Sequence, residues 1–210
     1  MITSMILAIL LAYLAGSIPT AIWVGKAFHG IDIRQHGSGN AGATNTIRVL
    51  GWKAGVPVLL VDIFKGWLAV WAGTQVIQGH LDSGELVYFR IGLAAVAVAG
   101  HVFPAFAGFR GGKGVATLLG VGFALYPHSA WVALVVFVLA LLISGYVSVS
   151  SMAAAMTFPL VEIFLFRQQH IGLIILAVLV AVFIPFIHRK NIKRLIRGEE
   201  TKFRPGKKKD

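Results

Sequence analysis

Three glycines around a lysine, in the segment GHVFPAFAGFRGGKGVAT at residues 100–117, have the clearest chemical potential in this chain. Glycine adopts backbone conformations that other residues avoid, so successive N–H groups in such a turn can point into one hollow and bind an anion. A lysine beside them adds a full positive charge. The spacing is not that of a Walker A loop, because Gly114 follows Lys113 where Ser or Thr would stand. Taken alone, the segment fits a phosphate site and a plain turn between membrane helices equally well.

Another polar, glycine-rich segment lies earlier in the chain, at residues 26–53; in chain order it is the first glycine-rich segment, and residues 100–117 are the second. Its centre reads HGSGNAGATN from His36 to Asn45, and Arg48 comes three residues later. An arginine can bind phosphate through two parallel hydrogen bonds, while Ser, Thr and Asn side chains supply neutral hydrogen bonds. A flexible surface loop would also be rich in glycine and asparagine. Two such segments in one short chain favour the anion-binding interpretation.

The composition is that of a protein embedded in a membrane. The 210 residues are 57% hydrophobic and 13% charged, with a mean hydropathy of +0.81, far from the values of soluble domains. No cysteine is present, which excludes disulfides and thiolate chemistry. The net charge of +11 does not require a nucleic-acid partner, because Lys and Arg accumulate in the cytoplasmic loops of membrane proteins.

The apolar segments predict an all-α fold, a polytopic membrane bundle of about seven transmembrane helices with cytoplasmic glycine-rich loops. The first segment is too long for a removable signal peptide and lacks a cleavage site, and its Pro19 predicts a kink. One segment would be only about 18 Å long as a helix, against the ~30 Å of the hydrocarbon core. The predicted segments are 2–25, 54–78, 87–107, the short 115–126, 129–146, 152–166 and 171–187.

Charged and hydroxyl side chains also occur inside or beside these segments. Asp62 and Lys65 lie three residues apart, hence on one face of a helix. Charges at membrane depth are costly and usually face a bundle interior, so a structural ion pair and a catalytic role are equally good interpretations. A serine cluster around 144–151 is more typical of helix caps than of function. In the tail, His188 and Asn191 are spaced to share one helical face with Arg194.

The positions of the basic residues predict the topology. Of the 19 Lys and Arg residues, all but three lie in residues 26–53, in residues 100–114 or in the tail. The positive-inside rule then places these regions in the cytoplasm, with the N-terminus outside and the C-terminus inside. We interpret residues 1–210 as a single integral-membrane domain that ends in a basic cytoplasmic tail, residues 189–210. The three exceptions are Lys65, Arg90 and Arg167.

Several long motifs resemble those of the bacterial membrane-integral acylphosphate:glycerol-3-phosphate acyltransferases. They occur in the family's order between residues 16 and 202, so that the resemblance covers essentially the whole chain. The serine turn GYVSVSSM is similar but less distinctive. The matching segments are GSIPTAIWVGK, GSGNAGATNTIRVLG, DIFKG, GHVFPAFAGFRGGKGVAT and HRKNIKRLIRGEETK.

The resemblance implies transfer of a fatty acyl group from acyl phosphate to the 1-hydroxyl of sn-glycerol 3-phosphate. The products would be lysophosphatidic acid and phosphate, in the first step of phospholipid synthesis at the bacterial cytoplasmic (inner) membrane. Such a reaction needs two anion sites and an apolar groove, which the glycine-rich segments, the basic tail and the bundle can supply. The donor is already activated, so positioning and charge neutralisation can carry most of the catalysis. We expect no cofactor, no metal and no nucleic-acid partner; the oligomeric state is open.

The resemblance also suggests which residues form the site. Either His101 or His188 could accept the proton of the attacking hydroxyl near neutral pH; we favour His188 as a residue that orients the glycerol hydroxyls, with the departing phosphate taking the proton. The expected catalytic residues are Ser38, Arg48, Lys113, His188 and Asn191. The expected substrate-binding residues are Asn40, Gly42, Thr44, Asn45, His101, Gly111, Gly112, Gly114, Thr117, Arg194 and Glu200.

Other classes of function fit the sequence less well. A membrane transporter of a phosphorylated small molecule or lipid is the main alternative, but the two halves of the chain show no inverted repeat. A phosphotransferase that uses CDP-alcohols would need clustered aspartates to hold a metal, and only Asp62 lies within an apolar segment. A scaffold without activity would have no reason to gather so many polar groups on one side of the membrane.

Overall fold

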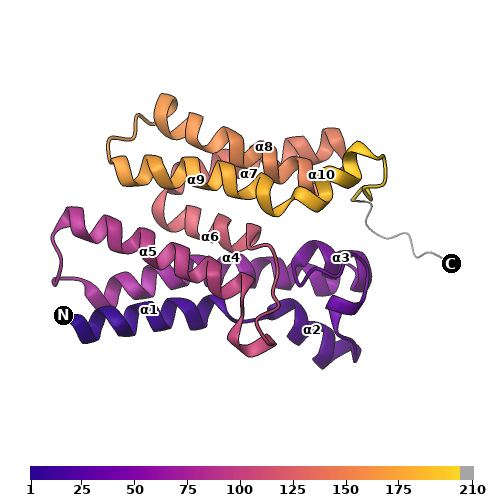
Figure 1. Ribbon diagram of the computed structural model, residues 1–210, viewed down its shortest axis with the longest axis horizontal. Helices are drawn as coiled ribbons and strands as arrows, with labels where there is room; N and C mark the ends of the chain where they lie inside the picture. The colour runs from indigo at the N-terminus through magenta and orange to yellow at the C-terminus, as the bar shows by residue number, and fades with distance from the viewer. Residues whose placement is uncertain (204–210) are drawn as a thin grey trace. The chain divides into compact units, whose positions relative to one another are not determined.

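The computed structural model describes residues 1–203, and within them the regular structure is entirely helical (Figure 1). The chain divides into two compact units. Unit 1 comprises Met1–Leu125, and unit 2 begins at Tyr126. Part of the predicted tail, residues 204–210, lies outside the described residues. The interpretation as one functional domain therefore stays a prediction.

Unit 1 is built around one long helix, α4. The helices α1, α3, α5 and α6 all pack against it, and α4 lies among α1, α5 and α6 in Figure 1. The elements of unit 1 are α1 (Ile2–Gly16), α2 (Thr20–His29), the 3₁₀ turn η1 (Ile33–Gln35), α3 (Ala43–Leu50), α4 (Trp52–Ile77), α5 (Ser83–Val102), the 3₁₀ turn η2 (Ala105–Ala107) and α6 (Val115–Leu125).

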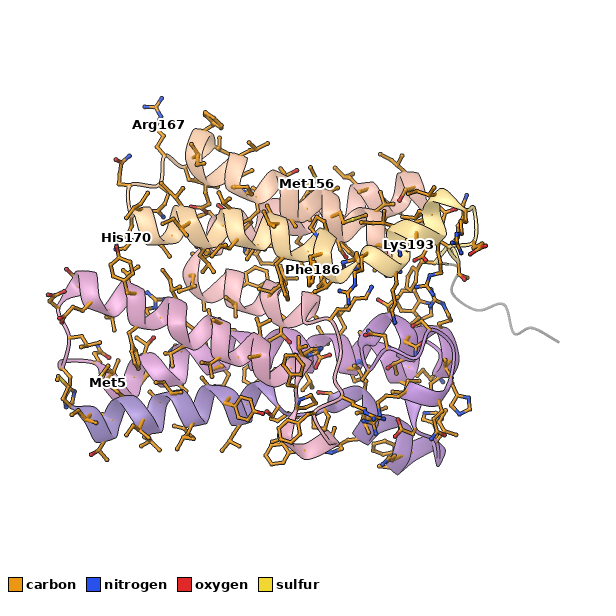
Figure 2. The ribbon with its side chains drawn as sticks, viewed as in Figure 1. Met5, Met156, Arg167, His170, Phe186 and Lys193 are labelled. Atoms are coloured by element: carbon orange, nitrogen blue, oxygen red, sulfur yellow. The ribbon has the colours of Figure 1, made fainter. Side chains whose placement is uncertain are left out.

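In unit 2, α8 packs against both α7 and α9. Figure 2 shows Arg167 and His170 at one end of this unit and Lys193 at the other. The predicted segment 171–187 coincides with α9. The elements of unit 2 are α7 (Pro127–Ser144), α8 (Val147–Leu160), the π-helix η3 (Val161–Leu165), α9 (Ile171–Ile187) and α10 (Arg189–Ile196).

The all-helical membrane fold is confirmed, but some of the predicted spans consist of two helices with a bend between them. Four helical stretches are long and apolar enough to cross a membrane: Trp52–Ile77, Ser83–Ala107, Pro127–Ser144 and Val147–Leu165. Two bent pairs, α1 with α2 and α9 with α10, raise the number among the described residues to six. The short α6 would have to cross as well to give the predicted seven. The kink expected at Pro19 is the 44° bend between α1 and α2.

The structure adds local detail to two segments. The polar segment 26–53 contains a short amphipathic helix, α3, which lies between Gly42 and Gly51. The serine cluster spans the turn at Gly145 and Tyr146 between α7 and α8 and continues into α8, where the hydroxyls of Ser150 and Ser151 donate to the carbonyls of Tyr146 and Val147 at 2.8 Å. Each hydroxyl thus binds a backbone carbonyl four residues earlier in the chain, which is a structural role.

Glycines bring α6 into direct backbone contact with α4. A Cβ atom at Gly66 would overlap the carbonyl oxygen of Thr117, and one at Gly120 would overlap that of Ile63. Small residues permit such close approach between helices in a membrane, where van der Waals packing drives association. The short α6 is therefore fixed against the middle of α4, beside the charged pair that α4 carries.

Candidate functional site

A small hollow lies in unit 1, where the break between α1 and α2 meets α4, the end of α5 and the residues before α6. It contains about 190 Å³ of empty space, part of it open to solvent. Both glycine-rich segments reach it, the first with Ala41 and the second with two glycines. Its lining consists of Ile18, Pro19, Thr20, Ala41, Asp62, Lys65, His101, Pro104, Gly111 and Gly112.

A buried ion pair forms one wall of the hollow. Lys65 Nζ lies 2.7 Å from Asp62 Oδ1, and the two side chains are only 3% and 2% exposed. Lys65 Nζ also donates to the carbonyl oxygen of Ile18 at 2.7 Å, and Thr20 Oγ1 donates to Asp62 at 3.3 Å. Ile18 lies in the break between the end of α1 at Gly16 and the start of α2 at Thr20, so the lysine satisfies a carbonyl at the break. Of the two interpretations of these charges, the geometry shows the ion pair.

His101 and Thr117, at the two ends of the second glycine-rich segment, pack together beside its glycine turn. Thr117 Oγ1 lies 3.0 Å from His101 Nδ1, and both side chains are buried. The other ring nitrogen, Nε2, faces Gly112: a Cβ atom there would overlap it and would come within 2.7 Å of the carbonyl oxygen of Ala41. Thr117 Oγ1 and His101 Nδ1 thus bind each other, while His101 also lines the hollow; the expected substrate contacts of both residues stay a prediction.

The glycine turn itself differs from the expected anion nest. The N–H of Gly111 donates to Val102 O at 3.0 Å, and the N–H of Gly112 donates to His101 O at 3.3 Å. Two N–H groups that were expected to bind phosphate are thus engaged with the end of α5. Gly114, which precedes α6, has a φ of +77°, a conformation that favours glycine. Gly111 and Gly112 still line the hollow, and their expected contacts with phosphate stay a prediction.

Asn45 holds the first glycine-rich segment in shape. Its side-chain amide donates to Ile33 O at 3.1 Å and to His36 O at 3.0 Å, and its Oδ1 accepts the N–H of Ser38 at 2.8 Å. Asn45 is buried and braces this segment; its expected contact with substrate stays a prediction. The consequence is a rigid segment that leaves Ser38 exposed.

The structure brings together the two glycine-rich segments, though not every predicted residue. Ser38 and Arg48 are exposed, Asn40, Thr44 and Lys113 are half-buried, and Gly42 is buried at the start of α3. Thr20, Asp62 and Lys65 line the hollow without having been predicted as site residues. The signal for the last two was present in the sequence, since two charges three residues apart inside an apolar helix usually face a bundle interior.

Unit 2 contains a second polar cluster, where α9 bends by 55° into α10. Asn191 Nδ2 donates to Glu200 Oε1 at 2.5 Å, and Ser148 Oγ donates to the same oxygen at 3.3 Å. Arg194 Nε lies 2.9 Å from Glu200 Oε2. The cluster therefore unites three predicted residues, Asn191, Arg194 and Glu200, around one carboxylate.

His188 stands at the bend itself and is buried. Its Nδ1 lies 2.8 Å from the carbonyl oxygen of Ile184. A carbonyl oxygen can only accept, so Nδ1 carries the proton and, in the neutral ring, Nε2 carries the lone pair. Among the described residues, no three His, Asp or Glu side chains come together as metal ligands.

Comparisons with known proteins agree on one family. The family model described as glycerol-3-phosphate acyltransferase matches residues 6–198. Proteins of that name from Listeria welshimeri and Fusobacterium nucleatum are 47% and 41% identical to the chain, over 97% and 93% of its length and 99% and 96% of their own.

Two crystal structures are also similar to the chain. Both are of PlsY (YgiH), an integral membrane glycerol 3-phosphate acyltransferase. The glycerol 3-phosphate form has a TM-score of 0.81 and 38% identity, and the lysophosphatidic acid form has a TM-score of 0.78 and 37% identity. Each comparison covers 96% of both chains.

The ion pair leads to a prediction about stability. Lys65→Met leaves the carboxylate of Asp62 buried without its partner and should lower the free energy of unfolding by about 3–5 kcal/mol. The double variant Asp62→Leu/Lys65→Met removes both charges and should recover most of that loss. Unfolding in detergent micelles with a rising fraction of SDS measures both. Thr74→Val is the control, because it removes a hydroxyl bonded within the same helix. A Lys65→Met variant as stable as the parent would contradict the structural role of the pair.

Proposed function

The chain belongs to the glycerol-3-phosphate acyltransferase family, and we propose from this that it acylates glycerol 3-phosphate to lysophosphatidic acid. The observation that carries the proposal is its similarity, over 96% of both chains, to an integral membrane acyltransferase crystallised in glycerol 3-phosphate and lysophosphatidic acid forms. The two glycine-rich segments that meet at the hollow of unit 1 support it, because the substrate and the product both carry a phosphate.

We propose acyl phosphate as the donor, as the sequence motifs imply. The glycerol 1-hydroxyl oxygen attacks the acyl carbon, the bond from that carbon to the phosphate oxygen breaks, and inorganic phosphate leaves. The hydroxyl proton passes to the departing phosphate, whose oxygens lie next to the reacting atoms. A mixed anhydride is already activated, so the protein has mainly to position two anionic substrates and neutralise their charge.

In unit 1, we propose that Ser38, Arg48 and Lys113 bind the phosphate groups. The bracing of the first segment by Asn45 supports a fixed position for Ser38. Arg48 lies in the last turn of α3, exposed, where its guanidinium can reach a phosphate with two parallel hydrogen bonds. The remaining proposed substrate contacts of these segments are Asn40, Gly42, Thr44, Asn45, His101, Gly111, Gly112, Gly114 and Thr117.

In unit 2, we propose that His188 and Asn191 orient the glycerol hydroxyls. The bond from His188 Nδ1 to Ile184 O fixes the ring and determines which of its nitrogens carries the proton. Glu200 accepts the amide N–H of Asn191 with Oε1 and pairs with Arg194 through Oε2. Such preorganisation lowers the entropy cost of binding a small polyol in a defined orientation.

The protein is an integral membrane protein with several spans. We propose that the membrane is the bacterial cytoplasmic membrane and that the reaction takes place at its cytoplasmic side. The clustering of Lys and Arg in the glycine-rich segments and the tail supports this orientation, with the N-terminus outside and the C-terminus inside.

The choice of donor can be tested directly. Purified protein in detergent is incubated with labelled glycerol 3-phosphate and with acyl phosphate, acyl-CoA or acyl carrier protein of the same chain length. We expect lysophosphatidic acid from acyl phosphate at a rate at least about 100-fold above the other donors, a difference of about 2.7 kcal/mol in the activation free energy. A blank without protein corrects for spontaneous acyl transfer. Equal rates with acyl-CoA would refute the donor, and no product from any donor would refute the activity.

Arg48→Ala tests the acceptor site. The loss of a charge-assisted contact worth about 1.5–3 kcal/mol should raise KM for glycerol 3-phosphate about 10- to 100-fold. KM for acyl phosphate should change little. Lys53→Ala, which removes an exposed charge nearby in the first turn of α4, should leave both constants within about twofold. An unchanged KM in folded Arg48→Ala protein would remove Arg48 from the site.

His188→Gln tests the path of the proton. Glutamine keeps a hydrogen bond but cannot titrate, so an orienting role predicts a fall in kcat/KM of about 10- to 100-fold with the shape of the pH profile unchanged between about pH 6 and 9. The matched control is His170→Gln, at the other end of unit 2 from α10, which should retain full activity. A loss of several orders of magnitude, together with loss of the acid-side pH dependence, would make His188 the base.

A further inference from the structure

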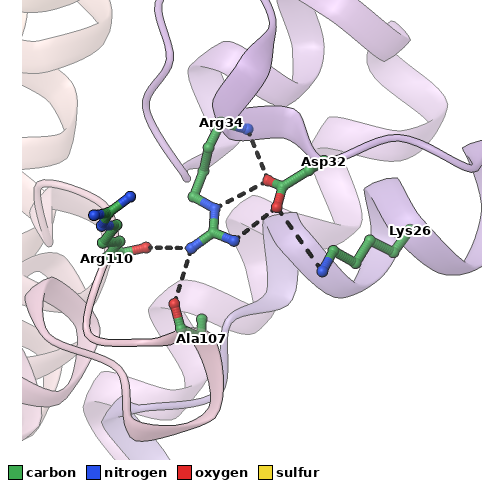
Figure 3. Close-up of polar contacts among 5 residues, drawn as sticks. All are labelled: Lys26, Asp32, Arg34, Ala107 and Arg110. Carbon is green, nitrogen blue, oxygen red and sulfur yellow. Dashed lines mark hydrogen bonds and ion pairs between the residues drawn. The ribbon is translucent and has the colours of Figure 1, made fainter.

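We propose that Arg34 is a positioning residue for acyl transfer, which clamps the second glycine-rich segment to the first and is itself held by Asp32. The proposal rests on the proposed function, because it concerns how the two phosphate-binding segments are kept in register. Arg34 lies in the 3₁₀ turn η1 of unit 1, and all its contacts in Figure 3 lie in the same unit.

The guanidinium of Arg34 donates hydrogen bonds from two of its edges (Figure 3). On one edge, Nε and Nη2 donate to Oδ1 and Oδ2 of Asp32 at 3.0 and 2.7 Å. On the other, Nη1 donates to Ala107 O at 2.8 Å and to Arg110 O at 3.3 Å. Four of the five N–H hydrogens of the guanidinium are thus directed at protein acceptors. This use of its donors argues for positioning and against contact with substrate.

The two carbonyls that Nη1 binds flank a strained turn. Gly108 has a φ of +63° and Phe109 a φ of +58°, and Phe109 has a side chain that makes this left-handed conformation unfavourable. A conformation of this kind is unfavourable and persists only where the surrounding structure holds it. Arg34 holds this turn, because it binds the carbonyl before it and the carbonyl after it with a single nitrogen.

The residues that follow this turn in the chain lead directly to Lys113, so the hydrogen bonds of Arg34 affect where Lys113 lies. Arg110 is joined directly to Gly111 and Gly112, which pack against His101 and Ala41, and then to Lys113. On its own side, Arg34 precedes Ser38 by four residues, in the segment that Asn45 braces. One guanidinium therefore connects the segment that presents Ser38 to the segment that presents Lys113. The distance between two proposed phosphate ligands depends on it.

Asp32 is suited to hold this arginine permanently. The side-chain hydrogen bonds from Arg34 lower the pKa of Asp32 to about 2, and Lys26, 3.9 Å away, contributes to the same shift. Because the pKa is lowered in the folded protein, the pair stabilises the fold fully above about pH 4 and is lost only as the pH falls through about 2. Asp32 also caps η1 by accepting the backbone N–H of Arg34 at 3.1 Å. The clamp is therefore intact at any pH near neutrality.

Arg34→Lys is the decisive variant, since an ammonium cannot bind a carboxylate in a fork and two carbonyls at once. A misplacement of reacting groups by about 1 Å can lower a rate about 100-fold, so we expect kcat to fall by that order. KM for glycerol 3-phosphate and for acyl phosphate should stay within about threefold of the parent, because each segment keeps its own ligands. A role in folding alone would reduce the yield of folded protein and leave kcat unchanged.

Two further measurements keep the proposal open to refutation. In Arg34→Ala, added guanidinium chloride at millimolar concentration should restore part of kcat, and sodium chloride at the same concentration should not. Tryptic cleavage after Arg110, detected by mass spectrometry, should become faster in Arg34→Ala than in the parent or in Lys53→Ala, whether or not the proposed reaction is correct. Asp32→Asn should lower kcat as Arg34→Lys does, and it replaces Arg34→Ala in the cleavage experiment if Arg34→Ala does not fold.

The outcomes separate this inference from the proposed function. An Arg34→Lys enzyme with the kcat of the parent would overturn the positioning role, as would cleavage after Arg110 at the rate of the parent in Arg34→Ala. Failure of the parent itself to form lysophosphatidic acid would refute the proposed function, while the cleavage experiment would still test the clamp.

Discussion

Two opposite charges buried in the middle of α4 are the constraint on which unit 1 depends. Neither Asp62 nor Lys65 could remain ionised alone at that depth, because the loss of hydration costs several kcal/mol per charge. Each is therefore bound to the other and to groups at the α1–α2 break, with Lys65 on Ile18 O and Asp62 on Thr20 Oγ1. The break, which would otherwise expose an unsatisfied carbonyl, thus becomes a fixed part of the wall of the hollow.

Close backbone packing extends this fixed wall to the second glycine-rich segment. Gly66 and Gly120 bring α6 against α4, which places Thr117 beside His101. His101 in turn lies beneath Gly112, where a Cβ atom would overlap its ring. The glycines of this region therefore have a packing role as well as the conformational freedom that a turn needs. The order of dependence runs from the α4–α6 packing through Thr117 and His101 to the turn that carries Lys113.

In both units, polar side chains bind other protein groups and hold them in place. In unit 1, Asn45 uses its amide on the backbone of its own segment, and Arg34 uses its guanidinium on the neighbouring one. In unit 2, Glu200 binds Asn191 and pairs with Arg194. With an activated donor, positioning can supply most of the rate enhancement. Many hydrogen bonds that fix the site residues therefore suit the proposed reaction.

The sequence by itself determined the membrane class, the kink at Pro19, the segment 171–187 and the family. These depend on composition, on hydrophobic length and on motifs, which are properties of the chain and need no knowledge of contacts. Asp62 and Lys65 could also be recognised as unusual from the sequence, because charge is rarely placed inside an apolar helix.

Only the tertiary structure decided which polar residues are available for chemistry. A motif identifies Asn45, His101 and Thr117 as polar but not whether the protein itself uses their hydrogen bonds, and distances of 2.8–3.1 Å to neighbouring groups show that it does. The importance of Arg34 was likewise invisible in the sequence, because its partners Ala107 and Arg110 contribute only carbonyl oxygens. Every residue has a carbonyl, so side-chain identity cannot reveal such a contact; it exists only once the chain has folded.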